Sequence, residues 1–479
     1  MQIDKIIKES EKTPEEKKKI LEEVKINLEK KRTMNLSIKE GSATSVMSGL
    51  GESYIVPFAI ALKSSNFQIS MLTSFTGLIS PIAQIFGSNL MEKNPRKKII
   101  CIGVAFQALM WIPILLLGIF MYKNILTSYL PFFLILFYIL YAISGAIAGP
   151  AWFSLMGDLV PEKKRGEYFG NRNKIAGTIA LIATLTGAFI LDYFKTHGIV
   201  LIGFAVLFFF ASIFRLISAS LFRKHYDPEF KLNDGYYFSL WQFLKKAYSN
   251  NFGRFAIMVA LMQFATAISG PFFAVYMLKD LQFSYATFMF VNISASIASL
   301  LVFPFLGRFS DKYGNRELIK LGAILIPFVP ILWLISPNPI YIILIPQLLS
   351  GAAWAAFNLG AGNFIYDSVT PQKRGLVVAY YNVLIGIGIF IGATLGGLLA
   401  QYLTITFMNI LLFIFLVSGL VRLAVVIFML PKIREVKTVK KPKSNPLIYI
   451  KEIRPIKGII YEAVHDITKV KKIIWRKRR

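Results

Sequence analysis

The sequence has few of the residues on which disulfide frameworks, thiolate metal sites and histidine chemistry depend. Of its 479 residues one is cysteine, Cys101, and three are histidine, His197, His225 and His465. A single cysteine excludes a disulfide framework and a thiolate metal site. The histidines fall outside the long apolar segments, which excludes a histidine proton relay within them. Those segments also hold no His/Asp, Ser/His or metal-binding constellation, so we expect no enzyme active site, no metal and no cofactor.

Acidic residues are also scarce, because 26 Asp and Glu stand against 54 Lys and Arg and give a formal net charge of +28. Such an excess can mark a nucleic-acid-binding protein. Here no basic segment carries interleaved base-stacking aromatics, so no nucleic-acid partner is expected. No apolar h-region follows the start, which argues against a cleavable signal peptide. No Walker loop follows a strand, so we expect no direct use of ATP.

Long apolar segments are what the chain does contain, since 55% of its residues are hydrophobic and 41 are Phe. A run of about 18 or more apolar residues predicts a membrane-spanning helix, because in lipid the backbone must satisfy its own hydrogen bonds. The sequence predicts an all-α integral membrane protein with twelve transmembrane helices. The predicted spans are 44–62, 67–90, 99–121, 130–156, 168–191, 199–222, 255–278, 286–306, 318–335, 340–366, 376–399 and 407–430.

One short motif occurs twice, about half the chain apart. Asp158 is followed seven residues later by Arg165 and then Gly, and Asp367 is followed in the same way by Arg374. Both copies lie between long apolar segments, which indicates two similar six-helix halves. We therefore expect a charged cytosolic segment at 1–43, a first bundle at 44–222, a cytosolic connector at 223–254, a second bundle at 255–430 and a basic cytosolic tail at 431–479.

The basic residues are distributed unevenly between the two sides of these spans. Outside the spans, only Lys63, Lys123, Lys195 and Lys279 lie in the loops of one side, and nearly all other Lys and Arg lie on the opposite side. The positive-inside rule places both termini in the cytosol of a multi-pass protein of the cell membrane. The basic tail is expected to bind anionic lipids, at about 1 kcal/mol per basic residue near the surface.

The loop after the eighth predicted span carries Gly307, Asp311, Gly314 and a basic residue, Arg316. This pattern resembles the loop signature of the major facilitator superfamily, as does the repeated Asp and Arg-Gly motif. The loop after the second span keeps its Gly and basic cluster, but Met91 stands where Asp is expected. The resemblance covers about residues 44–430. It implies a secondary transporter whose two bundles rock around one midplane site to move a small organic solute, by uptake or by efflux.

Charged residues at the predicted cytosolic helix ends are candidates for a gate. Arg is a planar, multidentate donor and Asp an acceptor, so such pairs can hold this side closed and release it when the halves move. The alternative is that they are ordinary exposed loop charges, whose pairs contribute about 0–1 kcal/mol. The candidate gate residues are Asp158, Arg165, Asp311, Arg316, Asp367 and Arg374.

Polar and aromatic residues within the spans outline a candidate substrate cavity, because the resemblance implies that their helices line the central cavity. They are Tyr54, Trp152, Gln263, Asn292, Trp354, Asn358 and Asn382. The alternative is that Asn and Gln join helices and that Trp packs between them. For the whole protein, the alternative to a monomeric transporter is a membrane sensor or assembly factor with the same fold and no transport activity.

Glu52 is the one carboxylate placed well inside a predicted span. It lies eight residues from Thr44, which is roughly 12 Å at 1.5 Å per residue. An ionised carboxylate there is costly, and burial favours the neutral form, so we expect Glu52 to bind and release protons and to couple transport to a proton or cation gradient. The alternatives are an ion pair with Arg215 or Arg422, and direct contact with the substrate.

Overall fold

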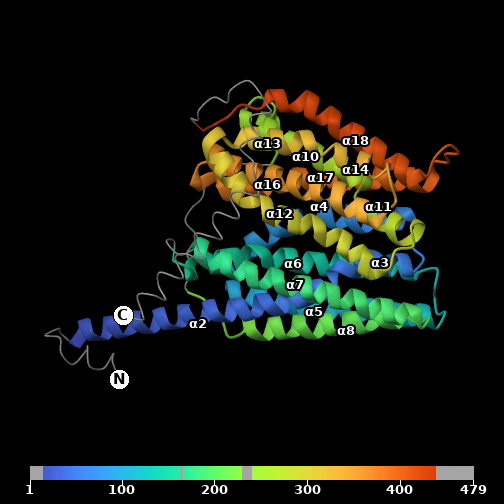
Figure 1. Cartoon of the computed structure of the whole chain (residues 1–479). Helices are drawn as coiled ribbons and strands as arrows, with labels where there is room; N and C mark the ends of the chain where they lie inside the picture. The colour runs from blue at the N-terminus through green and yellow to red at the C-terminus, as the bar shows by residue number, and fades with distance from the viewer. Residues whose placement is uncertain (1–13, 162–164, 229–239, 438–479) are drawn as a thin grey trace, which may run out of the picture. The chain divides into compact units, whose positions relative to one another are not determined.

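The structure is a computed structural model that describes residues 14–161, 165–228 and 240–437 (Figure 1). These residues form helices joined by turns, and no strand occurs among them. They fall into two compact units, each assembled from separate stretches of chain. The first unit comprises Met1–Tyr237, Gln263–Phe290 and Ala379–Ile414, and the second comprises Phe238–Met262, Val291–Val378 and Phe415–Arg479.

Ten stretches of described helix are long and apolar enough to cross a membrane. They include α4 (Asn66–Leu90), α5 (Arg96–Tyr122), α6 (Leu130–Leu159), α7 (Arg165–Thr196), α8 (Val200–Phe222), α10 (Asn251–Ser269), α12 (Tyr285–Tyr313), α16 (Leu348–Ser368), α17 (Pro371–Tyr402) and α18 (Ile410–Met429). Short segments extend two of them: α11 (Phe272–Val275) and η3 (Tyr276–Asp280) follow α10, while α15 (Pro339–Ile342) and η4 (Ile343–Gln347) precede α16. These stretches match ten of the twelve predicted spans.

The other two predicted spans, the first and the ninth, are helical but interrupted. Span 44–62 is formed by the end of α2 (Pro14–Leu50), by η1 (Glu52–Tyr54) and by α3 (Ile55–Ala61). Span 318–335 is formed by α13 (Asn315–Leu325) and α14 (Phe328–Leu332), which are separated at Pro327. Proline lacks the backbone N–H that a continuous helix needs, which accounts for the second break. Glu52 therefore begins the short η1 turn within a helix break.

α2 is longer than the predicted first span and crosses the predicted boundary at residue 43 without ending. Its residues Thr33, Ser37 and Glu40 are 0%, 0% and 3% exposed. The helix packs against α7 and α8 in the first unit. The latter part of the predicted cytosolic segment 1–43 thus contributes polar side chains to a packed interior.

Aromatic side chains fill the core of the first unit beside the break in span one. The ring centroid of Phe58 lies 5.2 Å from that of Phe204 and 4.9 Å from that of Phe208, which stacks on Trp111 at 5.2 Å. A Cβ placed on Gly51 would lie 2.6 Å from Trp111. The absence of a side chain at Gly51 therefore lets Trp111 pack against the break.

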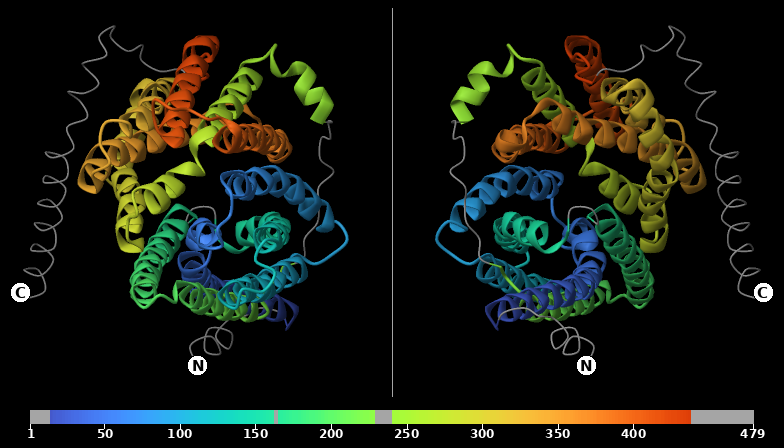
Figure 2. Two further views of the ribbon diagram at one scale, coloured as in Figure 1. Left: turned by 90° about the vertical axis from the view of Figure 1, so that its right-hand side faces the viewer. Right: turned by 90° about the vertical axis from the view of Figure 1, so that its left-hand side faces the viewer.

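In the first unit, α5 packs against α6 and α8, and α4 packs against α6, as the end-on views of Figure 2 let the reader follow. Small residues bring α17 close to α4. A Cβ on Gly386 would lie 2.5 Å from the Gly77 carbonyl oxygen, and Ser74 donates a hydrogen bond of 2.9 Å to the Phe390 carbonyl. In the second unit, α13 packs against α16, where a Cβ on Gly322 would lie 2.6 Å from the Ala353 carbonyl oxygen.

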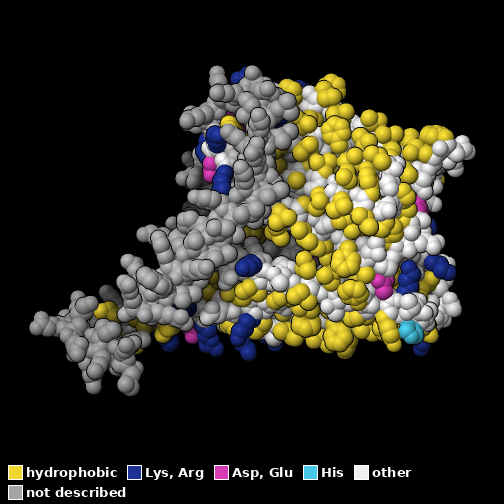
Figure 3. All heavy atoms as spheres, viewed as in Figure 1, with side chains coloured by type: hydrophobic (Ala, Val, Ile, Leu, Met, Phe, Trp, Pro, Cys, Tyr) yellow, Lys and Arg dark blue, Asp and Glu magenta, His cyan; other side chains and the backbone are white. Residues whose placement is uncertain are grey.

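Large hydrophobic side chains are exposed on the helices, as Phe153 at 74% and Phe428 at 69% illustrate. Figure 3 shows hydrophobic side chains spread over the face in view, with Lys, Arg, Asp and Glu mostly near the ends of helices. Apolar surface of this extent is unusual on a monomeric soluble protein. It fits helices that are surrounded by lipid and confirms the predicted all-α membrane fold class.

Candidate functional site

The carboxylate of Glu52 is held by hydroxyl groups from two elements. Its Oε1 accepts a hydrogen bond of 2.6 Å from the Tyr141 hydroxyl on α6, and its Oε2 accepts one from the Ser48 hydroxyl on α2. The side chain is half-buried. An ionised carboxylate is an acceptor only, so both contacts suit its charged form. The arrangement presents a partly buried acid at the point where span one is interrupted.

Arg215, a suggested ion-pair partner of Glu52, directs its guanidinium elsewhere. This buried side chain on α8 donates through Nε to Oε1 of Gln107 at 3.1 Å and through Nη1 to the Thr44 hydroxyl at 2.8 Å. The Gln107 amide in turn donates to the Tyr141 carbonyl oxygen at 3.2 Å. The other suggested partner, Arg422, is buried in the second unit, where Nη1 lies 3.4 Å from the Ile326 carbonyl oxygen.

A second carboxylate, Glu40, lies within the same region of the first unit. Its Oε1 accepts hydrogen bonds from the Thr44 hydroxyl at 2.6 Å and the Ser218 hydroxyl at 3.0 Å. Its Oε2 forms an ion pair of 3.3 Å with Nη2 of Arg172 on α7. Sequence reasoning missed Glu40 because it belongs to the charged segment 1–43. One sequence feature could have indicated Glu40: polar residues recur every four positions and share a helix face. They are Glu40, Thr44, Ser48 and Glu52.

Trp152, a predicted cavity residue, is in contact with the half-buried Arg172 of this ion pair. The Arg172 guanidinium carbon lies 4.8 Å from the centroid of the Trp152 ring, within the range of a cation–π interaction. The Trp152 side chain is half-buried on α6. Arg172 thus links the Glu40 carboxylate to a candidate substrate residue.

The other predicted cavity residues are divided between the units. Tyr54 is fully buried in the first unit and donates a hydrogen bond to the Thr184 carbonyl, while Gln263 and Asn382 are half-buried there. In the second unit Asn292 and Asn358 are exposed and Trp354 is half-buried. The immediate contacts of Tyr54 are those of a packed residue. A common cavity for the seven residues stays a prediction.

The candidate gate residue Asp158 is paired with a residue that sequence reasoning did not single out. Nη1 of Arg96, which is 1% exposed, lies 2.6 Å from Oδ2 of Asp158 and 2.9 Å from the Ser154 hydroxyl. Nε of Arg96 also lies 3.3 Å from Asp227. Arg165 instead donates to the Gly157 carbonyl oxygen at the end of α6, at 2.7 Å.

The corresponding candidates in the second unit have different contacts. Asp367 accepts a hydrogen bond of 2.6 Å from the Asn315 amide. Arg316 donates through Nε to the Ile433 carbonyl at 2.7 Å. Asp311 is exposed and lies 3.6 Å from the Lys437 amine. The side chain of Arg374 lies outside the described residues. The expected gating function of these side chains stays a prediction.

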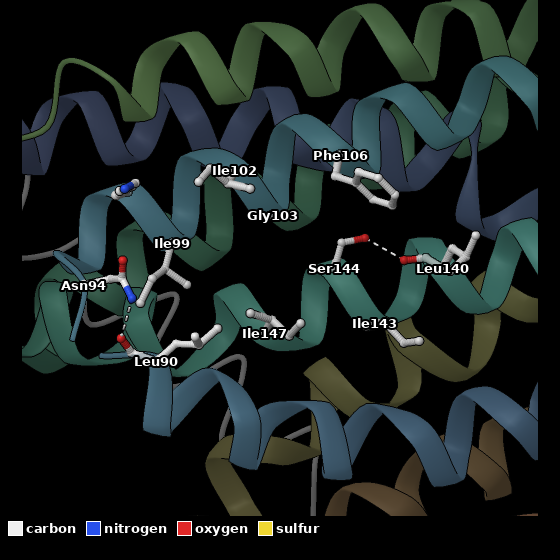
Figure 4. A pocket seen from close by; sticks show the side chains of 11 residues that line it. Leu90, Asn94, Ile99, Ile102, Gly103, Phe106, Leu140, Ile143, Ser144 and Ile147 are labelled. Carbon is white, nitrogen blue, oxygen red and sulfur yellow. Dashed lines mark hydrogen bonds between the residues drawn. The ribbon is translucent and has the colours of Figure 1, made fainter. Parts of the chain in front are cut away.

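An apolar groove of about 470 Å³ runs along the surface of the first unit (Figure 4). Ser144, in its wall, donates its hydroxyl to the Leu140 carbonyl at 2.6 Å, so that hydroxyl is already satisfied. The groove holds neither Glu52 nor Glu40 and is therefore separate from the carboxylate network. Its lining residues are Leu90, Asn94, Lys98, Ile99, Ile102, Gly103, Phe106, Leu140, Ile143, Ser144 and Ile147.

Comparison with protein-family models shows a match to the Major Facilitator Superfamily over residues 42–247 and 255–478. The chain belongs to the Major Facilitator Superfamily. The chain is a multi-pass membrane protein of this family, and the resemblance inferred from the loop after span eight is confirmed.

Relatives in this superfamily include proteins named for multidrug resistance. The chain is 25% identical over 261 residues to "Multi-drug resistance efflux pump PmrA homolog" of Lactococcus lactis, covering 52% of this chain and 61% of that protein. It is 25% identical over 371 residues to "Multidrug resistance protein MdtG" of Proteus mirabilis, covering 74% and 86%. Matches to "Multidrug resistance protein 1" and "2" of Bacillus subtilis cover 37% and 31% of those proteins. Three of these four matches thus span under two thirds of the relative's length.

Solved structures of transporters share the fold. The nucleoside transporter NupG has a TM-score of 0.61 and 14% identity, with 83% of this chain and 99% of NupG covered. A POT family transporter in complex with a thioalcohol-conjugated peptide has a TM-score of 0.63 and 12% identity, with 84% and 96% covered. At these identities the likeness concerns the fold alone.

Proposed function

We propose that this superfamily member is a proton-coupled antiporter that exports amphiphilic organic solutes, with Glu52 as the residue that binds the coupling proton. The observation that carries the proposal is the Glu52 carboxylate, held by the Tyr141 and Ser48 hydroxyls inside an interrupted span. Export of organic solutes is supported by the names of two relatives, one called a multi-drug resistance efflux pump and the other a multidrug resistance protein.

The position of Glu52 in a helix break supports this role. Discontinuous membrane helices commonly form the substrate and ion sites of secondary transporters, because backbone groups freed at the break can meet a ligand. A carboxyl group whose contacts are hydroxyls can exchange its proton with them directly, whereas a carboxylate paired with a guanidinium takes up a proton only as that ion pair is released. The two hydroxyl contacts, together with the diversion of Arg215 to Gln107 and Thr44, favour proton coupling over a structural ion pair.

The remaining assignments belong to the same proposal. The protein is a monomer in the cell membrane with both termini in the cytosol, and it carries no catalytic site or cofactor. Its substrate contacts the predicted cavity residues, and the predicted gate residues regulate access from the cytosol. Anionic lipids bind the basic tail beyond residue 437, which lies outside the described residues.

Transport by purified protein in proteoliposomes tests the role of Glu52. Ethidium, a fluorescent lipophilic cation, serves as the probe under an imposed proton gradient. We expect wild-type protein to build an ethidium gradient, and Glu52→Gln to equilibrate ethidium without accumulating it. Glu22→Gln, which changes an exposed carboxylate on the preceding helix α2, is the matched control and should accumulate ethidium normally.

Full proton-driven accumulation by Glu52→Gln would show that Glu52 is not the coupling residue. If the wild type moves neither ethidium nor any other organic solute, the non-transporting sensor becomes the better account. A thermal-shift series with the same solutes separates loss of binding from loss of coupling, since a bound solute raises the unfolding temperature.

A further inference from the structure

Four polar side chains follow one another at four-residue intervals: Glu40, Thr44 and Ser48 on α2, and Glu52 at the start of η1. Residues four apart share a face of a helix, so they form a polar stripe that continues from α2 into η1. The hydroxyl nearest each end is bonded to the carboxylate there. Thr44 donates to Glu40 at 2.6 Å, and Ser48 donates to Glu52. The stripe thus places two hydroxyl groups between two acids.

The surroundings of Glu40 fix it at one end of this stripe. Arg172 from α7 and Ser218 from α8 contact its carboxylate directly. Arg215 reaches it through the Thr44 and Ser218 hydroxyls, with which its Nη1 makes contacts of 2.8 and 3.4 Å. Tyr168 on α7 and His225 beyond α8 are the other titratable groups whose electrostatic environment includes Glu40.

We propose that Glu40 is a second proton-binding site, which exchanges a proton with Glu52 along the α2 stripe. The inference rests on the proposed role of Glu52. The path requires one bridging water between the Ser48 and Thr44 hydroxyls, because side chains four apart on a helix are about 5–6 Å apart at Cβ.

The exchange is a series of proton transfers in which no electrons are gained or lost. The O–H bond of the Glu52 carboxyl breaks and a new one forms at the Ser48 oxygen, which passes its own proton to the water. The water passes a proton to the Thr44 oxygen, and Thr44 passes its original proton to Oε1 of Glu40. One proton has then moved from Glu52 to Glu40, and every hydroxyl and the water are regenerated.

Proton binding at Glu40 has a structural consequence. A protonated Glu40 has no charge to attract Arg172, and its new O–H must donate to a neighbour. Arg172 lies over the ring of Trp152, a candidate substrate residue. The proton on Glu40 therefore alters the contact between Arg172 and Trp152, which connects proton binding to the substrate cavity.

Infrared difference spectroscopy of the purified full-length protein tests the second site without a transport assay. Protonated carboxyl groups have a carbonyl band of their own, and spectra are compared between alkaline and acidic pH. We expect Glu40→Gln to remove one band of the wild type and Glu52→Gln to remove another and to shift the band that remains. An unchanged spectrum in Glu40→Gln overturns the inference, whatever Glu52→Gln does in transport. Accumulation of ethidium by Glu52→Gln refutes the proposed function. The infrared band of Glu40 does not depend on that result and tests the second site separately.

The path itself is tested by Thr44→Val, which removes the hydroxyl and keeps the shape. We expect proton exchange, followed as the rate at which the carboxyl bands respond to a pH jump, to slow roughly tenfold or more. Ser45→Ala removes a neighbouring buried hydroxyl bonded to the Gly41 carbonyl and serves as the control, with an unchanged rate. Equal rates in Thr44→Val and the wild type contradict a path through Thr44.

Discussion

At the scale of single residues, the buried charged side chains are the most informative features of this protein, and Arg96 is the clearest case. A cation that is 1% exposed is tolerable only when carboxylates and polar groups compensate it. The Arg96 guanidinium contacts Asp158 and Ser154 on α6, and it contacts Asp227 in the segment after α8. Arg96 thereby joins three parts of the first unit.

Replacing Arg96 should therefore destabilise the protein. Arg96→Gln leaves the Asp158 and Asp227 carboxylates without their shared cation, and we expect a loss of about 3 kcal/mol in the free energy of unfolding. Thermal unfolding in detergent measures the effect. Lys98→Gln, an exposed residue at the same end of α5, is the control and should stay within about 0.5 kcal/mol of wild type. Equal stability of the two variants would refute a structural role for Arg96.

His225 gives a pH-dependent prediction outside the spans. It is 2% exposed, and burial lowers the pKa of its imidazole below the usual 6.5, while a hydrogen bond to the Leu221 carbonyl and the charge of Glu40 oppose this. Lys97 and Arg172 also lower the pKa. The unfolded chain then binds a proton more readily than the folded one. The contribution of neutral His225 to the free energy of unfolding is therefore complete above pH about 6.5, and it is lost as the pH falls through the folded-state pKa.

We expect the unfolding temperature of the wild type to fall between neutral and mildly acid pH, and the fall to be smaller in His225→Gln. His197→Gln changes an exposed histidine and should leave the pH profile as in the wild type. If the unfolding temperature varies with pH in the same way in the wild type and in His225→Gln, His225 does not contribute to the pH dependence of stability.

At the scale of elements, hydropathy was sufficient to predict most helices and insufficient to predict where they break. An apolar run looks the same whether its helix is continuous or interrupted, so the η1 turn in span one was not predicted. The sequence indicated Glu52 through its depth in that span. Glu40 and Arg96 were not recognised, because neighbouring charges placed them in segments that normally face water. Glu40 contacts side chains on α7 and α8, and Arg96 contacts Asp158 on α6. These partners are distant in sequence, so the local sequence pattern does not indicate the contacts.

Gly51 offers a test of the packing beside this break. A Cβ there would lie 2.6 Å from Trp111 and 2.8 Å from the Met47 carbonyl oxygen. We expect Gly51→Ala to lower the free energy of unfolding by about 1–3 kcal/mol, as overpacking does. Gly177→Ala is the matched control, because a Cβ at Gly177 meets no atom within 4 Å. A neutral Gly51→Ala would contradict the tight packing of Trp111 on η1.

At the scale of the whole molecule, the repeated Asp and Arg-Gly motif and the loop after span eight were enough to identify the superfamily. Substrate and direction could not be read from the sequence, since both depend on how side chains from distant spans meet. The orientation in the membrane was predicted from charge alone, and it can be tested independently of transport.

We expect both termini to be cytosolic. In a Cys101→Ser background, cysteines placed at Lys63 or Lys279 should react with an impermeant maleimide added to intact cells. A cysteine at Lys163 should react only after the membrane is permeabilised. Labelling of position 163 in intact cells would reverse the predicted topology.

The most direct test of proton coupling is to record both fluxes in the same proteoliposomes, with ethidium fluorescence for the solute and an entrapped pH-sensitive dye for protons. In the wild type, we predict that an imposed ethidium gradient drives protons in the opposite direction, and that Glu52→Gln moves ethidium without protons. Ethidium movement by the wild type with no accompanying proton flux, or unchanged proton flux in Glu52→Gln, would contradict antiport coupled through Glu52.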